Sequence, residues 1–121
     1  MMNQTCICLY IRYTVSKVPE DTIIVDLRST KYVNFTCPIV SKNKEKDEEL
    51  YATWYIKRKD TDKEREIMYT QGRYDFPTFV GLLVENLRPE DEAVYICKRG
   101  LTPEIVKIFR LLILGKIIIL S

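Results

Sequence analysis

The stretch at residues 82–97, LLVENLRPEDEAVYIC, decides the fold of this chain. Apolar side chains alternate with other side chains on both sides of a turn-forming centre, and a period of two is typical of β-strands. In the second half, Ala93, Tyr95 and Cys97 therefore share one face of a strand predicted at residues 93–99. The centre, LRPEDE, contains a proline and three acidic residues and predicts a turn or a single helical turn.

The same alternation recurs along the chain, together with many β-branched and aromatic residues, so we predict an all-β fold. In a strand predicted at residues 32–39, Phe35 and Cys37 lie on the inward face. In another, at residues 50–58, Trp54 lies on the inward face. Further strands are predicted at residues 23–27, 66–70, 79–85 (with Gly81 marking a bulge) and within 105–120. Charged residues at 41–49 and 59–65 predict solvated loops, and residues 71–77 are turn-prone.

Length and composition limit the classes of protein and function. A chain of 121 residues suits one ordinary domain, which we place at residues 21–121, after a leader or frayed segment at residues 1–20. The net charge of +2 gives no indication of a nucleic-acid partner, and no uncharged apolar run is long enough to span a bilayer. The chain has no histidine, which excludes Ser-His-Asp and Cys-His catalysis and histidine-bearing metal sites. It also lacks a phosphate-binding loop and an activated nucleophile, so we expect no enzyme activity and no cofactor.

The four cysteines fall into two groups. Cys6 and Cys8 lie near the amino end, whereas Cys37 and Cys97 each lie in an alternating apolar segment and are a candidate structural pair. This spacing does not match the two close pairs of a four-thiolate zinc site, so we expect no metal. A disulfide indicates an oxidising compartment and hence a secreted or surface-displayed protein. Residues 1–16 have only a short apolar stretch and no basic start, so Cys6 and Cys8 belong either to a degenerate leader or to a frayed end.

Two inward cysteines with the inward Trp54 between them resemble the core of the immunoglobulin superfamily. Residues 82–97 resemble one region of its variable-type domains, in which Asp, Ala, Tyr and Cys alternate as they do from Asp91 to Cys97. The resemblance implies an immunoglobulin-like β-sandwich of two antiparallel sheets with about seven or eight strands, joined by a Cys37–Cys97 disulfide.

The resemblance also assigns roles to individual residues. The hydroxyl of Tyr95 is expected to bond to the backbone upstream of it, an arrangement called a tyrosine corner. Asp91 is expected to pair with a basic residue, and Arg73 is the candidate. The remaining expected core residues are Trp54, Leu82, Val84 and Leu87.

Two departures from the family pattern bear on which type of immunoglobulin-like domain the chain resembles. The segment between Trp54 and Cys97 is shorter than in full variable-type domains, so some of the strands between them should be reduced or missing, and the variable and intermediate types both stay open. The carboxyl end has no Phe-Gly-x-Gly motif, which argues against a rearranged antigen receptor.

Within the superfamily, Cys37-Pro38 and the stretch WYIKRKDTDKEREI at residues 54–67 resemble the first domains of interleukin-1-receptor-like proteins, including soluble viral decoys. The chain has no cysteine after Cys97, whereas those domains generally have one. The resemblance implies a protein partner, either a cytokine or a leukocyte surface protein, and a role in immune recognition or viral immune evasion. The alternative is a structural or adhesion module, or a truncated fragment of a longer receptor with no ligand of its own.

We expect a partner to bind the outward face of the strands predicted at residues 50–58 and 66–70, which we call the C-face. Tyrosine with neighbouring cations is enriched at protein interfaces. The candidate binding residues are Tyr51, Tyr55, Lys57 and Tyr69. The same tyrosines could instead pack under a loop or across strands.

Asn34-Phe35-Thr36 and Asn3-Gln4-Thr5 match the acceptor pattern for N-linked glycans. Asn34 is predicted to point outward, so that a glycan there would cover the sheet opposite the C-face.

Overall fold

The structure, a computed structural model, describes residues 18–41 and 49–115. Predictions about Asn3, Cys6, Cys8, residues 1–17 of the leader or frayed segment and most of the charged loop at 41–49 lie outside these residues. The strands are β1 (Glu20–Asp26), β2 (Tyr32–Thr36), β3 (Ala52–Lys57), β4 (Arg65–Glu66), β5 (Tyr74–Asp75), β6 (Gly81–Glu85), β7 (Ala93–Arg99) and β8 (Ile105–Leu114). A 3-10 helix at Pro89–Asp91 forms the helical turn predicted from LRPEDE.

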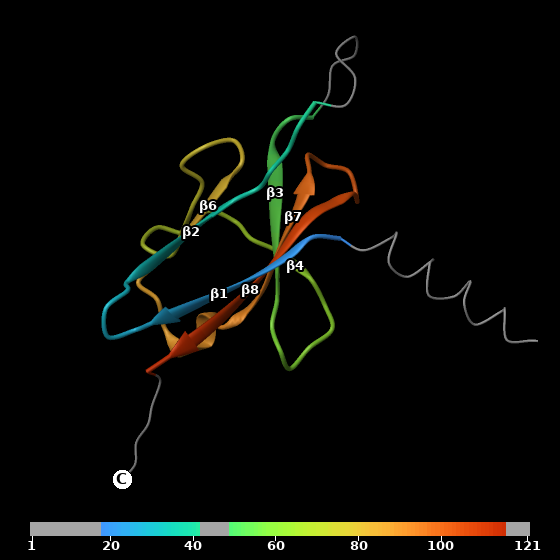
Figure 1. Cartoon of the computed structure of the whole chain (residues 1–121). Coiled ribbons are helices and arrows are strands. Elements are labelled where there is room, and N and C mark those ends of the chain that lie inside the picture. The colour runs from blue at the N-terminus through green and yellow to red at the C-terminus, as the bar shows by residue number, and fades with distance from the viewer. Residues whose placement is uncertain (1–17, 42–48, 116–121) are drawn as a thin grey trace, which may run out of the picture.

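The strands form two sheets, which confirms the predicted all-β sandwich. One sheet has five strands in the order β1-β8-β7-β3-β4, and the other has three in the order β2-β6-β5. Figure 1 shows β1 running beside β8, with β2 and β6 together in the other layer. β1 pairs with β8 in parallel, whereas the remaining strand pairs are antiparallel.

Aromatic side chains from both sheets fill the space between them. The ring of Phe35 on β2 lies 4.9 Å from that of Phe109, 5.0 Å from that of Tyr95 and 6.0 Å from that of Trp54, measured between centroids. Leu82 and Val84 of β6 are fully buried in this core, and Leu87 packs against its edge. The alternation in β2 and β6 therefore has its expected cause, because every second side chain enters this core.

The region between β3 and β6 differs from the sequence prediction. The strand predicted at residues 66–70 ends at Glu66, since Ile67 is drawn into the core and the chain turns back where Thr70 and Tyr74 exchange backbone hydrogen bonds. Tyr69 therefore does not lie on a strand. The turn-prone segment 71–77 contains the short strand β5, which the sequence analysis missed.

The predicted bulge is also in the wrong place. Gly81 pairs regularly with Thr36, and its small size has a different reason: a Cβ there would lie 2.9 Å from the Thr78 hydroxyl oxygen. The register shift lies between Cys97 and Lys98 of β7 instead.

Candidate functional site

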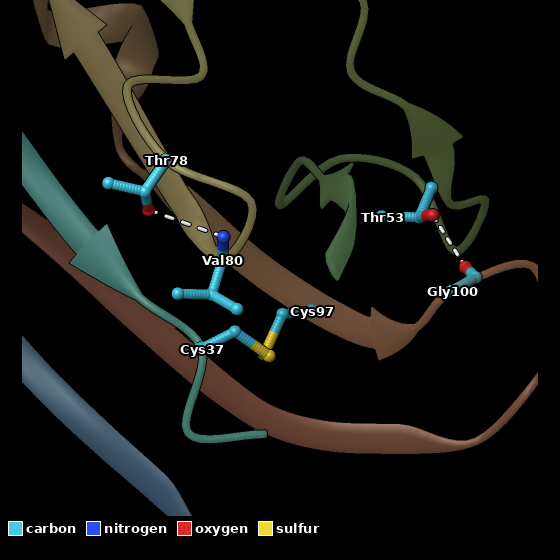
Figure 2. The surroundings of a disulfide bond; sticks show 6 residues. All are labelled: Cys37, Thr53, Thr78, Val80, Cys97 and Gly100. Carbon is cyan, nitrogen blue, oxygen red and sulfur yellow. Dashed lines mark hydrogen bonds between the residues drawn. A yellow bond between two sulfur atoms is a disulfide. The ribbon is translucent and has the colours of Figure 1, made fainter. Parts of the chain in front are cut away.

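A disulfide joins the two layers near one end of the sandwich. Cys37 follows β2, Cys97 lies on β7, and their Cα atoms are 6.0 Å apart. Both residues are buried, as the inward alternation predicts, and Trp54 is buried in the same core. Figure 2 shows the disulfide between two local tethers, in which Thr53 bonds to the carbonyl of Gly100 and the backbone N–H of Val80 bonds to Thr78. This end of the domain is therefore held in a fixed arrangement.

The turn before β7 brings together the three residues expected at the corner. The Tyr95 hydroxyl donates a 2.6 Å hydrogen bond to the backbone carbonyl of Asp91. The Arg73 guanidinium lies 2.5 Å from the Asp91 carboxylate, which is almost fully buried, and also donates to the carbonyls of Glu85 and Asn86. The other carboxylate oxygen accepts the backbone N–H of Arg88. Each oxygen of the Asp91 carboxylate thus has a hydrogen-bond partner, one of them in the turn and the other on Arg73.

Burial acts differently on the two groups that bond to Asp91. Burial, and then the charge of Asp91, raise the pKa of the Tyr95 hydroxyl far above its ordinary value of 10.0. Burial disfavours the charged form of Arg73 and acts to lower its pKa. The hydrogen bond to Asp91 and the charge of Asp91 outweigh this effect, so the pKa of the guanidinium is raised. The corner therefore holds a neutral phenol beside the Arg73–Asp91 ion pair, which suits a structural role.

The loops at the disulfide end are tied to one another by Glu49. Its carboxylate accepts a 2.6 Å bond from the backbone N–H of Leu101 and a longer one from the Tyr51 hydroxyl. The N–H of Gly100 donates to the carbonyl of Tyr51 at 2.7 Å. Gly100 has a φ of +50°, and a Cβ there would collide with the Glu49 side chain. A glycine is needed for this close approach.

Two adjoining hollows lie beside β3 at the same end, and we call them together the edge groove. The larger has a volume of about 550 Å³ and the smaller about 340 Å³, and both are lined by Ala52 and Phe76. The other lining residues are Pro77, Thr78 and Phe79 in the larger hollow and Thr53, Trp54, Glu66, Ile67, Met68 and Tyr69 in the smaller. Phe79 is 85% exposed, Met68 63% and Tyr69 62%. The edge groove is therefore bordered by large apolar side chains in contact with solvent.

No protein-family model matches this chain, and no curated protein matches it. Solved structures do. Drosophila semaphorin 2a is 25% identical over 79% of this chain and 14% of its own, with a TM-score of 0.61. The extracellular domain of the voltage-gated sodium channel β4 subunit is 18% identical over 88% of this chain and 94% of its own, with a TM-score of 0.57. The N-terminal four Ig domains of Dscam1 isoform 9.44 are 15% identical over 81% of this chain and 23% of their own, with a TM-score of 0.55.

The fold is an immunoglobulin-like β-sandwich. Together with the disulfide between its layers, the likeness to these structures supports the resemblance at the level of fold. The chain spans about a seventh of the semaphorin chain and under a quarter of the Dscam1 fragment, but nearly the whole β4 domain. In this immunoglobulin-like domain the strands between β3 and β6 are reduced to two residues each, as the short spacing predicts.

The four predicted binding residues lie in different surroundings in this immunoglobulin-like domain. Tyr55 and Lys57 lie on β3 and are half-buried, and the Lys98 ammonium lies 4.3 Å from the centre of the Tyr55 ring. Tyr51 precedes β3 and bonds to Glu49. Tyr69 lies beyond β4 and borders the edge groove. The centre of the C-face is thus partly covered by a lysine, while its exposed aromatic surface lies at the edge.

The other residues that complete this surface were not predicted from the sequence. Phe76 lies in the segment predicted as turn-prone, Met68 lies within the strand predicted at residues 66–70, and Phe79 lies at the start of the strand predicted at residues 79–85. The available signal was the pair of phenylalanines on either side of Pro77, because large aromatic residues in a loop have no place in a strand pattern.

Within residues 18–41 and 49–115, no group of three or more acidic, cysteine or histidine side chains could hold a metal ion. In the same ranges, no helix has the length and hydropathy that crossing a bilayer requires.

Proposed function

We propose that this immunoglobulin domain is an extracellular protein-binding module of the receptor or decoy-receptor type, and that the edge groove is its binding surface. One observation supports the binding role above all. Large apolar side chains gather around the edge groove, where they face solvent on a scaffold fixed by the disulfide and the loop tethers. Clusters of this kind on a rigid scaffold mark protein interaction sites, and aromatic residues are enriched there.

The charges of the edge groove define the chemistry of the partner. Glu66 is the only charged residue among those that line its two hollows in the described part of the chain, and Asp75 lies next to Phe76 in sequence. A complementary protein segment presents an aliphatic or aromatic side chain to the groove and a lysine or arginine beside it. Such a segment would gain from both apolar burial and opposite charge.

One line of support favours an immune role for this module, and a second favours recognition through the edge groove. The stretch at residues 54–67 resembles interleukin-1-receptor-like domains, which favours a cytokine as the partner. The fold is one that proteins use for recognition through loops and outer faces, and the edge groove lies where the loop before β3 and the loop before β6 meet: the backbone N–H of Ala52 bonds to the carbonyl of Phe79. A leukocyte surface protein is the second class of partner to test.

A homophilic adhesion module is the alternative function. It is favoured by the likeness to the sodium channel β4 subunit, whose parallel homodimers are said to explain its role in cell–cell adhesion. In that case a second copy of this chain would occupy the surface. Analytical ultracentrifugation of the wild type and Phe79→Ser separates the two functions, because only the adhesion module forms a concentration-dependent dimer through the edge groove, which Phe79→Ser would weaken.

The test of the proposed function is a binding scan of the secreted domain against cytokines and leukocyte surface proteins. Phe79→Ser and Tyr69→Ala should each weaken binding of a true partner at least tenfold, as expected for interface aromatic residues. Tyr32→Ala is the matched control, since Tyr32 is 58% exposed on the opposite sheet. The Tyr32→Ala variant should bind the partner as tightly as the wild type does. If no ligand saturates the domain, or if Tyr32→Ala weakens binding as much as Tyr69→Ala, the edge groove is not the binding surface.

A further inference from the structure

The outer face of the three-stranded sheet differs from the edge groove in both shape and chemistry. Within the described residues, β2 pairs with β6 on one side and with no strand on the other, so it forms an edge of this sheet. Asn34 and Thr36 are exposed on β2, while Phe35 between them is buried. Both side chains therefore point away from the core, on the same face of the strand.

The three residues of this strand have the pattern that N-linked glycosylation requires. The acceptor is an asparagine amide, the residue that follows is not proline, and a hydroxyl stands two positions later. In the folded domain the amide of Asn34 faces solvent, so an attached sugar would not meet the packed core. The structure can accommodate the modification without any change in β2 or β6.

The surface around Asn34 has a hollow that could hold part of a sugar. A shallow hollow of about 370 Å³ is lined by Lys31, Tyr32, Asn34, Leu83, Glu85 and Asn86. Leu83 lies directly opposite Asn34 in the pairing of β2 with β6, and the ring of Tyr32 is more than half exposed beside it. The hollow thus combines apolar surface with polar groups, a mixture that suits the face and the hydroxyls of a sugar ring.

We propose that Asn34 carries an N-linked glycan, which covers the outer face of the three-stranded sheet and shields the open edge of β2. The donor is an oligosaccharide joined to a lipid pyrophosphate. The Asn34 side-chain nitrogen forms a bond to the anomeric carbon, the bond from that carbon to the pyrophosphate oxygen breaks, and the amide proton passes to a base. The lipid pyrophosphate leaves with the bonding electron pair. The inference rests on the proposed extracellular function, because the secretory pathway supplies this donor.

The glycan has two consequences for the domain. Unpaired edge strands are prone to pair with other chains, and a bulky hydrophilic group on β2 opposes such pairing. The residues that line the hollow at Asn34 are different from those that line the edge groove. The glycan therefore directs partners to the edge groove while it blocks the opposite sheet.

Site mapping by mass spectrometry tests the modification. The whole chain is secreted from eukaryotic cells behind a heterologous leader, and glycans are removed enzymatically in heavy-oxygen water, which labels each former glycosylation site. We expect label at Asn34 in the wild type and in Thr36→Ser, and none there in Asn34→Gln or Thr36→Ala. The separate acceptor at Asn3 falls in another peptide and does not confuse the result. Secreted protein with an intact Cys37–Cys97 disulfide and an unlabelled Asn34 would overturn the inference.

Self-association tests the shielding role independently. We expect Asn34→Gln to self-associate at concentrations at least tenfold lower than those at which the glycosylated wild type does, as measured by light scattering. We also expect Asn34→Gln to bind a partner at the edge groove as the wild type does. Equal association of the two proteins would overturn the shielding role. The proposed function fails separately, when no partner binds the edge groove of a protein whose Asn34 is glycosylated.

Discussion

The hydroxyl of Tyr95 donates its hydrogen bond to the backbone carbonyl of Asp91, four residues earlier, and both residues are fully buried. Tyr95→Phe removes the donor and leaves that carbonyl without it. We expect the free energy of unfolding to fall by about 1–3 kcal/mol, the usual cost of an unsatisfied buried group. Urea denaturation measures the change. Tyr32→Phe should have almost no effect, since Tyr32 is exposed on β2; equal losses in both variants would contradict the structural role of this bond.

Alkaline pH should destabilise the domain through the same tyrosine. The pKa of Tyr95 is raised in the folded protein, so its contribution to stability is fully present below the unfolded value of 10.0 and is lost as the pH rises above it. We expect the free energy of unfolding to fall by up to about 1.4 kcal/mol per pH unit above pH 10 from this group. The fall should be less steep in Tyr95→Phe than in the wild type, as measured by urea titration at each pH. Parallel slopes would contradict the raised pKa.

The buried ion pair between Arg73 and Asp91 should matter more than an exposed one. Arg73→Met leaves the Asp91 carboxylate buried without its cation and should lower the free energy of unfolding by about 3 kcal/mol. Arg73→Lys should recover part of this loss. The pair between Arg28 and Asp26 is the surface control, because the Arg28 side chain is 80% exposed, and Arg28→Met should have little effect. Comparable losses in the two methionine variants would argue against a special role of the corner.

Removal of the disulfide should destabilise the domain strongly. Replacing both Cys37 and Cys97 by alanine releases a loop that the bond closes over 60 residues, and chain-entropy estimates give a loss of about 4 kcal/mol. Thermal and urea unfolding of the variant, with the wild type under reducing conditions as a second sample, measure this. A double variant as stable as the oxidised wild type would show that packing around Trp54 holds the layers together without the bond.

Gly100→Ala should disturb the loops beside the edge groove. Its positive φ disfavours any side chain, and the new Cβ would collide with Glu49, so we expect a loss of about 1–3 kcal/mol in stability. Glu49→Gly in the same chain removes the whole side chain, including the Glu49 Cβ that would collide with the new atom, so it should recover the part due to the collision and leave the part due to the backbone. Urea denaturation of the two single variants and the double variant separates these parts. Additive losses would mean that the two side chains do not meet.

The sequence predicts the core of this fold well, because the pattern that marks core residues lies within each strand. Phe35 and Tyr95 belong to strands of five or more residues in which every second side chain is buried, and such alternation is visible in the sequence. The tyrosine corner and its arginine were available only through the resemblance, because Arg73 and Asp91 are far apart in sequence and nothing in their own neighbourhoods pairs them.

The edge of the domain could not be predicted in the same way. β4 and β5 have two residues each, too few to show a period, and they exist because their neighbours β3 and β6 offer hydrogen bonds. Tyr69 was assigned to the strand predicted at residues 66–70, yet the turn at Thr70 takes it off the sheet. The exposure of Phe79 depends on the path of the whole segment before β6. Binding surfaces made from such segments are set by tertiary contacts.

The parallel pairing of β1 with β8 has a mechanical consequence. Their register runs from Glu20 opposite Ile108 to Asp26 opposite Leu114, so the chain enters this pair at one end and leaves it at the other. Tension applied through both ends of the domain would pull the two strands along each other in opposite directions and load the bonds between them in shear, all at once. Bonds that share a load resist more force than bonds that open singly. After this pair parted, the Cys37–Cys97 bond would still limit how far the module could extend.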